Sequence, residues 1–96
     1  MKSQMITIKT KDGVIHKYSI NEITQNCYEI DLHDGSEWYS GKSPVFTSVD
    51  NAFIFVLKIM SWVNYPIDEI TSDCTFLDKA KITALCQNKN ITVNCY

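Results

Sequence analysis

The chain has 96 residues, the usual length of a single domain. A 45% share of hydrophobic residues and a 21% share of charged residues exclude a disordered chain, and three Gly and two Pro exclude a linker or a fibrous protein. The formal net charge is −2, and all nine basic residues are Lys. Direct nucleic-acid binding is therefore disfavoured, because such binding relies on a basic surface and on the bidentate guanidinium of Arg.

The N-terminal residues alternate between polar and apolar types and include no apolar leader segment. The longest apolar stretch, residues 52–63, is interrupted by Lys58 and Ser61 and is much shorter than the ~20 residues that cross a bilayer. We therefore expect a cytoplasmic protein that makes no contact with a membrane.

The four cysteines include no Cys-x-x-Cys pair, which zinc sites and thioredoxin-type centres require. Because a cytoplasmic protein keeps its thiols reduced, we expect four free and mostly buried thiols. One or two disulfides are the first alternative, and metal ligation is the second. The residues concerned are Cys27, Cys74, Cys86 and Cys95.

The first predicted element is a β-hairpin in which residues 5–11 and 14–20 flank Asp12-Gly13, a strong turn signal. A two-residue loop would place Ile8 opposite Lys17, whereas a three-residue loop over residues 11–13 gives one mainly apolar face. We therefore predict three cross-strand pairs: Thr10 with Val14, Ile8 with His16, and Ile6 with Tyr18.

A second hairpin is predicted from residues 27–32 and 36–41, joined by the loop 33–35. This register pairs Ile30 with Trp38 and Tyr28 with Ser40. The opposite face then places Asp31 directly across from Glu37, and like charges in that position destabilise a strand pair. Such a repulsion is retained where water screens it or where a cationic partner binds.

The second half of the chain predicts helices. A capping signal at Thr47-Ser-Val-Asp50 and the breaker Pro66 predict a helix over residues 49–63. A second apolar stripe lies beside the main one on this helix. One sheet face is too narrow to cover both stripes, so we expect the second stripe to contact another helix or a second copy of the chain. This apolar face consists of Phe55, Ile59 and Trp62.

A second helix is predicted over residues 76–87 after another capping signal, Thr75-Phe-Leu-Asp78, and a short strand over residues 91–95 ends the chain. Residues 82–86 are also compatible with one arm of a hairpin. The fold class is α+β in one domain, residues 1–96: an antiparallel sheet of two hairpins (1–46), then a helix (47–64), then a helix and a terminal strand (65–96). Both helices pack on one face of the sheet.

The near-neutral net charge conceals strong segregation along the chain. The successive segments 1–17, 18–41, 42–58, 59–78 and 79–96 carry net charges of +3, −5, +1, −4 and +3. Acidic blocks are often solvated surface, but they also attract basic proteins and accelerate their association. The residues expected to contact such a partner are Glu29, Asp31, Asp34, Glu37, Tyr39, Asp68 and Glu69.

No catalytic motif, metal site or cofactor site is predicted. Glu29, Asp31 and His33 would share one face of a strand, but side chains that project in parallel do not converge on an ion. A nucleophilic pair of Cys27 with His16 or His33 has no local sequence signature.

The size and the acidic patches resemble those of toxin-immunity proteins and phage anti-defence inhibitors, including anti-CRISPR-like proteins. This resemblance covers the general profile of the chain and no specific motif. It implies a small non-enzymatic inhibitor that neutralises a basic, nucleic-acid-handling protein such as a nuclease toxin. The alternatives are an assembly protein that dimerises through the apolar face of the first helix, and a small thiol-dependent enzyme or regulator.

Overall fold

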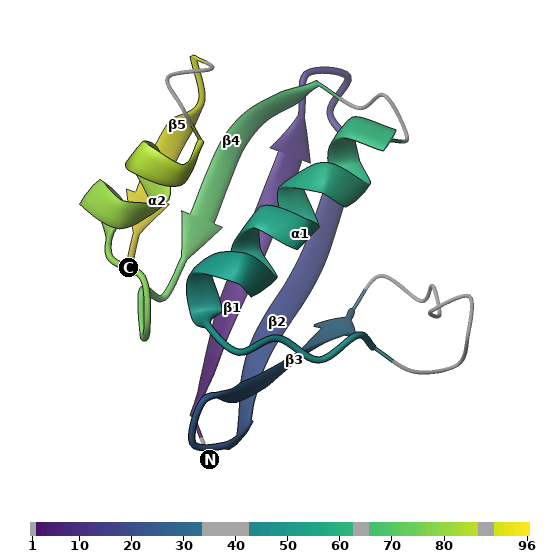
Figure 1. Cartoon of the computed structure of the whole chain (residues 1–96). Helices are drawn as coiled ribbons and strands as arrows, with labels where there is room; N and C mark the ends of the chain where they lie inside the picture. The colour runs from purple at the N-terminus through teal and green to yellow at the C-terminus, as the bar shows by residue number, and fades with distance from the viewer. Residues whose placement is uncertain (1, 34–42, 63–65, 87–89) are drawn as a thin grey trace.

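The computed structural model describes residues 2–33, 43–62, 66–86 and 90–96, with the backbone alone for residues 60–62. It contains a five-stranded sheet with two helices on one face (Figure 1). In chain order the elements are β1 (Ser3–Thr10), β2 (Ile15–Thr24), β3 (Cys27–Leu32), α1 (Val49–Trp62), β4 (Ile67–Ser72), α2 (Lys79–Leu85) and β5 (Thr92–Cys95).

The sheet is mixed rather than antiparallel. Its strand order is β3-β2-β1-β4-β5, and the β4–β5 pair is parallel while the other three pairs are antiparallel. The reason is that α2 carries the chain back across the sheet between β4 and β5, which is the connection that parallel neighbours need. The predicted α+β class is confirmed, and the wholly antiparallel sheet is wrong.

The first hairpin has the predicted register. Ile6 lies opposite Tyr18 and Ile8 opposite His16 in the β1–β2 ladder. In the loop the Thr10 N–H donates to the Val14 carbonyl at 2.9 Å, and Gly13 adopts a φ of 89°. Glycine suits this position because a positive φ is unfavourable for residues with a Cβ atom.

The second hairpin consists of β2 and β3 rather than residues 27–32 and 36–41. β2 extends to Thr24, and Asn26 adopts a φ of 60° in the turn that leads into β3. Tyr28 therefore pairs with Glu22 on one side and with Phe46 on the other, so its predicted pairing with Ser40 is wrong. The remaining predicted partners lie in residues 34–42, outside the described part of the chain.

Strand β4 is absent from the sequence prediction. Its two isoleucines, Ile67 and Ile70, are three residues apart, which breaks the alternation that indicates a strand. The structure explains this spacing by a bulge at Asp68, because Lys9 pairs with Glu69 while the next residue of β1 pairs with Ile67. The bulge directs both isoleucines to the core.

Helix α1 confirms the predicted helix to within one residue, and the Ser48 hydroxyl accepts from the Asn51 N–H at 3.2 Å at its start. α2 is shorter than predicted because Asp78 itself is the N-cap, accepting from the Lys81 N–H at 2.8 Å. The terminal strand is confirmed as β5. The alternative of a hairpin arm at residues 82–86 is wrong.

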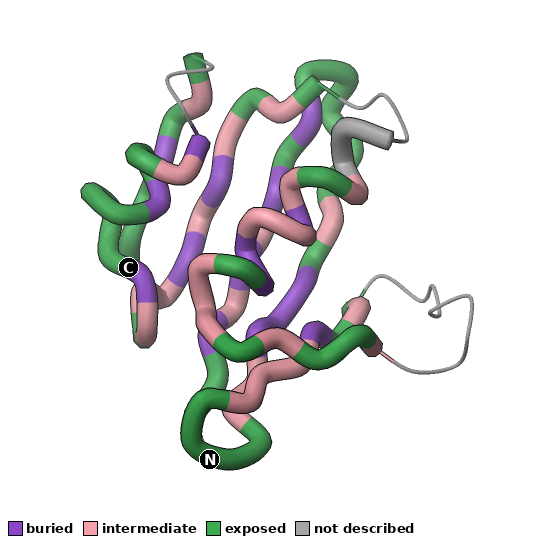
Figure 2. The backbone as a smooth tube through the Cα atoms, viewed as in Figure 1, coloured by how far each residue is buried: buried purple, intermediate pink, exposed green. Residues whose placement is uncertain are grey.

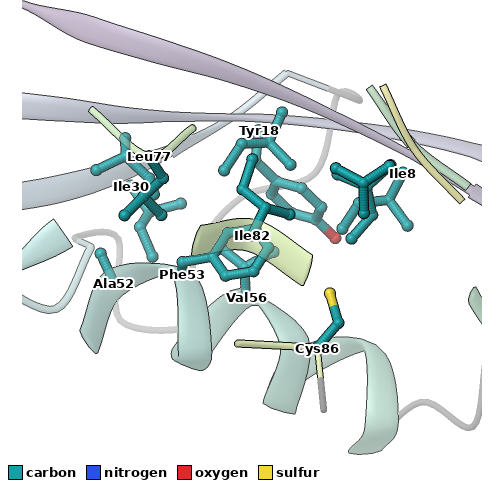
Figure 3. Close-up of a cluster of buried hydrophobic side chains, with 13 residues drawn as sticks. Ile8, Tyr18, Ile30, Ala52, Phe53, Val56, Leu77, Ile82 and Cys86 are labelled. Carbon is teal, nitrogen blue, oxygen red and sulfur yellow. The ribbon is translucent and has the colours of Figure 1, made fainter. Parts of the chain in front are cut away.

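The core lies between the sheet and the two helices (Figures 2 and 3). Alternate residues of each strand face the helices, as the burial along β1 illustrates. Fully buried side chains from α1 and α2 meet the strands there (Figure 3). The fully buried hydrophobic residues are Ile6, Ile8, Ile20, Ile30, Ala52, Phe53, Val56, Ile70 and Ile82.

Two polar residues of β1, Gln4 and Thr10, lie fully buried on this core side, and of the two Gln4 reaches the segment after β4. Its amide nitrogen donates to the Ser72 hydroxyl at 2.7 Å and to the Leu77 carbonyl at 3.0 Å. Its amide oxygen accepts from the Phe76 and Leu77 N–H groups, both at 2.8 Å. The amide therefore uses two donors and two acceptor positions, which is its full capacity, and it fixes the segment between β4 and α2 against β1.

A disulfide joins Cys74 to Cys95, with their Cα atoms 5.8 Å apart. The prediction of four reduced thiols is therefore wrong for two of the cysteines, while Cys27 and Cys86 form no disulfide. The physical reason is the parallel pairing of Ser72 with Cys95, which brings the ends of β4 and β5 together although the cysteines are 21 residues apart. The sequence spacing alone contains no sign of this proximity.

Removing the disulfide is expected to destabilise the fold. Replacing Cys74 and Cys95 together by Ser frees a loop of this length and should lower the free energy of unfolding by about 3 kcal/mol. Urea denaturation measures the change, with Cys27→Ser as a matched control that removes a free thiol. A reductant should lower the free energy of unfolding of the unchanged protein by the same amount and leave that of the double variant unaffected. If the stability of the unchanged protein does not respond to the reductant, the disulfide assignment is contradicted.

We expect Asp12 in the loop of the first hairpin to make a contribution to stability that depends on pH. The Thr10 hydroxyl donates to the carboxylate of Asp12 and lowers its pKa below 3.8. A depressed pKa in the folded state stabilises the fold above the unfolded pKa, and the stabilisation disappears as pH falls through the folded value. Asp12→Asn should therefore be less stable than the unchanged protein near pH 7 and equally stable near pH 2 in urea denaturation.

A double-mutant cycle with Thr10→Val identifies the cause of that pH dependence. In the Thr10→Val background the hydroxyl donor, the largest cause of the lowered Asp12 pKa, is missing, so the effect of Asp12→Asn should vary less with pH. A pH-dependent effect of the same size in both backgrounds would show that another group is responsible.

Candidate interaction surface

The sheet face opposite the helices is covered by no described element (Figure 1). We call it the open face. It is formed by the side chains that alternate with the buried ones along each strand, and most of them are polar. The open face comprises Ser3, Met5, Thr7, Lys9, Ile15, Lys17, Ser19, Asn21, Glu29, Asp31, Glu69, Thr71, Thr92 and Asn94.

The predicted acidic residues do not form one cluster. Glu29 and Asp31 lie on β3, whereas Asp68 and Glu69 lie on β4, with β2 and β1 between them. At about 4.8 Å per strand β3 and β4 are roughly 14 Å apart across the sheet, and the register offsets Asp31 from Glu69 by a further four residues along β1, about 13 Å. Asp34, Glu37 and Tyr39 lie outside the described residues.

The two acidic pairs have different electrostatic surroundings. Glu69 lies directly opposite Lys9 in the β1–β4 ladder, so a basic side chain partly balances its charge. Glu29 and Asp31 lie opposite Asn21 and Ser19, which are neutral, and form no ion pair with a described residue. Lys17 lies on the same face of β2, two residues from Ser19, and is a diagonal neighbour of Asp31, but no basic residue lies directly opposite either carboxylate of β3.

Asp31 is held by a neutral neighbour, while Glu37, the residue predicted to oppose it, lies outside the described residues. The Asn21 amide donates to its carboxylate at 2.7 Å. This bond uses part of the hydrogen-bonding capacity of the carboxylate and does not neutralise its charge, since asparagine is neutral. Asp31 is exposed and Glu29 is half-buried, so both carboxylates are available at the surface.

Ser19 and His33 form a contact that the sequence analysis missed. The Ser19 hydroxyl and the His33 Nε2 are 2.8 Å apart, and the exposed imidazole covers a serine that is 3% exposed. The two residues are 14 positions apart, and only the β2–β3 register brings them together. No described carboxylate is bonded to the other ring nitrogen, so the orienting group that completes a catalytic triad is not among the described residues.

The structure, in its described part, does not bring together the Cys–His pairs considered from the sequence. Cys27 pairs with Thr24 at the start of β3, whereas His33 comes directly after the end of β3. At ~3.3 Å per residue the two are about 20 Å apart along the strand. His16 is near the opposite end of β2 and on the helix side, opposite Ile8. Cys86 is buried in the core. Within the described residues no group of three or more His, Cys, Asp or Glu side chains is placed to hold a metal ion.

The apolar face predicted for α1 is partly covered by the chain itself. Phe46, in the segment that precedes the helix, packs against Phe55 with ring centroids 5.2 Å apart. Phe55 and Ile59 are both half-buried, and the side chain of Trp62 lies outside the described residues. Phe46 lies between the strand predicted to end at residue 41 and the helix predicted to begin at residue 49, so no local pattern predicts its contact with the helix. None of the helices described in the structure is long and apolar enough to cross a membrane.

No family model, no curated protein and no solved structure matches the chain.

Proposed function

We propose that this protein is a small non-enzymatic inhibitor that binds a basic, nucleic-acid-handling protein through the β3 side of its open face. Glu29 and Asp31 are the central contacts of this surface. The observation that carries the proposal is that these two carboxylates project from an uncovered sheet face and have no basic partner among the described residues.

Unpaired surface carboxylates favour a cationic partner because they attract it over a Debye length, about 8 Å at physiological ionic strength. The binding grooves of proteins that handle nucleic acids are basic, since they neutralise phosphate charge. An acidic surface that occupies such a groove excludes the nucleic acid without any chemical step. This mode of action is that of a toxin-immunity protein or of an anti-CRISPR-like inhibitor.

The surface fits binding better than catalysis. A sheet face that no other element covers is open to solvent, whereas enzymes enclose their substrates in concave pockets that exclude water. Asp31 is held by Asn21 and Ser19 by His33, so this part of the surface is ordered before a partner arrives. Preorganisation reduces the entropy that is lost on binding.

The test is a binding measurement on a partner captured with the unchanged protein. The captured protein is expected to be basic and to bind nucleic acid, and the unchanged protein should displace a DNA or RNA oligonucleotide from it. Reversing both charges with Glu29→Lys and Asp31→Lys should lower the association rate constant about tenfold at low salt, with a smaller effect at high salt.

The matched control reverses the two acidic residues on β4, Asp68→Lys and Glu69→Lys, which changes the net charge by the same amount. This control should reduce the association rate constant less than the β3 variant, because Glu69 is already opposed by Lys9. Equal effects of the two variants would indicate an effect of net charge alone. An unchanged rate constant in the β3 variant would refute the proposal.

A further inference from the structure

The two edges of the sheet are in different states. At the β3 edge, Tyr28 exchanges two backbone hydrogen bonds with Phe46, each 2.9 Å long, and the Ile30 N–H donates to the Ser43 hydroxyl at 2.9 Å. Residues 43–46 therefore occupy part of that edge. At the other edge, no described element lies beyond β5 (Figure 1).

The backbone of β5 has hydrogen-bonding groups that point away from the sheet. The Tyr96 N–H donates to the Ser72 carbonyl at 3.0 Å, so the backbone groups of Tyr96, and those of Asn94 two residues before it, point toward β4. Backbone groups of a strand point alternately to its two sides. Val93 and Cys95 consequently direct their N–H and C=O groups outward, and no described residue bonds to them there.

β5 is short, at four residues, but it lacks the charges, prolines and bulges that keep an edge strand from pairing. Its sequence, Thr92-Val-Asn-Cys95, contains no charge and no proline, and its register with β4 is regular. The disulfide to Cys74 fixes the end of the strand. The edge is therefore ordered and ready to accept another extended strand.

We propose that β5 pairs with β5 of a second copy of this chain, antiparallel about a twofold axis at Asn94. Val93 and Cys95 of each copy then exchange backbone hydrogen bonds with Cys95 and Val93 of the other copy, so all the outward groups of the strand are used. The sheet continues through both molecules. The proposal is independent of the proposed inhibitor function, because it uses neither the acidic residues of β3 nor α1.

The side chains of β5 favour a second copy over a charged peptide. In this register Asn94 faces Asn94 of the other copy, and two amides hydrogen-bond to each other with no charge to oppose them. Thr92 faces Tyr96, whose side chain is 73% exposed in the single chain. Aromatic and β-branched residues form favourable cross-strand pairs. The strand is thus complementary to itself.

The expected association is weak, because a four-residue strand buries much less surface than a standard interface of about 1,600 Å². Sedimentation equilibrium between about 10 µM and 1 mM should show the average mass rising from one chain towards two. Over the same range, hydrogen exchange of the Val93 and Cys95 amides should slow with concentration. The Asn94 amide, which faces β4, should show little dependence.

Charge placed at the twofold axis gives the decisive variants. Asn94→Lys brings two ammonium groups together and should weaken self-association at least about fivefold, and Asn94→Asp should act similarly. An equimolar mixture of the two variants should associate again, because opposite charges then face each other. That recovery shows that both variants are folded.

The matched control is Ser3→Lys, which adds the same charge to an exposed position on β1. It should associate like the unchanged protein. The proposal is overturned if the protein stays monomeric at the highest concentration, if Asn94→Lys associates as strongly as the Ser3→Lys control, or if the mixture of Asn94 variants does not recover.

Discussion

The buried amide of Gln4 is the interaction on which the arrangement of the second half of the chain depends. It lies on the core side of a central strand and binds backbone groups 72 and 73 residues further along the chain. In an apolar core each of these N–H and C=O groups would be costly without a partner. Around it, the Ser72 hydroxyl donates to the Met5 carbonyl at 2.7 Å, and the Asp73 carboxylate accepts from the Met5 N–H at 3.3 Å. The segment that leads into α2 is therefore shaped by β1.

This constraint also explains which surfaces the molecule leaves uncovered. With residues 72–77 fixed to β1, α2 packs against β5 on the same side of the sheet as α1 (Figure 1). The second face and the outer edge of β5 then have no cover from the described residues. These two regions are the ones proposed to bind a basic partner and a second copy. They are separate, so one molecule is able to use both.

The sequence allowed the first hairpin and its register to be predicted, because alternation and an Asp-Gly turn are local signals. Strand β4 was not predictable from the sequence, since the bulge at Asp68 conceals the alternation. The predicted start of α2 was too early, because Gln4 binds the N–H groups of Phe76 and Leu77. The disulfide depends on the contact between the ends of two strands. For the candidate site, the placement of Glu29 and Asp31 on one sheet face followed from alternation, whereas their separation from the acidic pair on β4 depends on strand order, which no local pattern encodes.

The most direct test of this account is the stability of Gln4→Met, which keeps the length of the side chain and removes its hydrogen bonds. The account predicts a loss of about 3 kcal/mol or more in urea denaturation, because several buried backbone groups lose their partners. Hydrogen exchange should also accelerate at Phe76 and Leu77. Asn21→Met, which removes a polar contact on the open face, is the control and should cost less than about 1 kcal/mol. A loss for Gln4→Met no larger than that of the control, with unchanged exchange at Phe76 and Leu77, would contradict the central role of this amide.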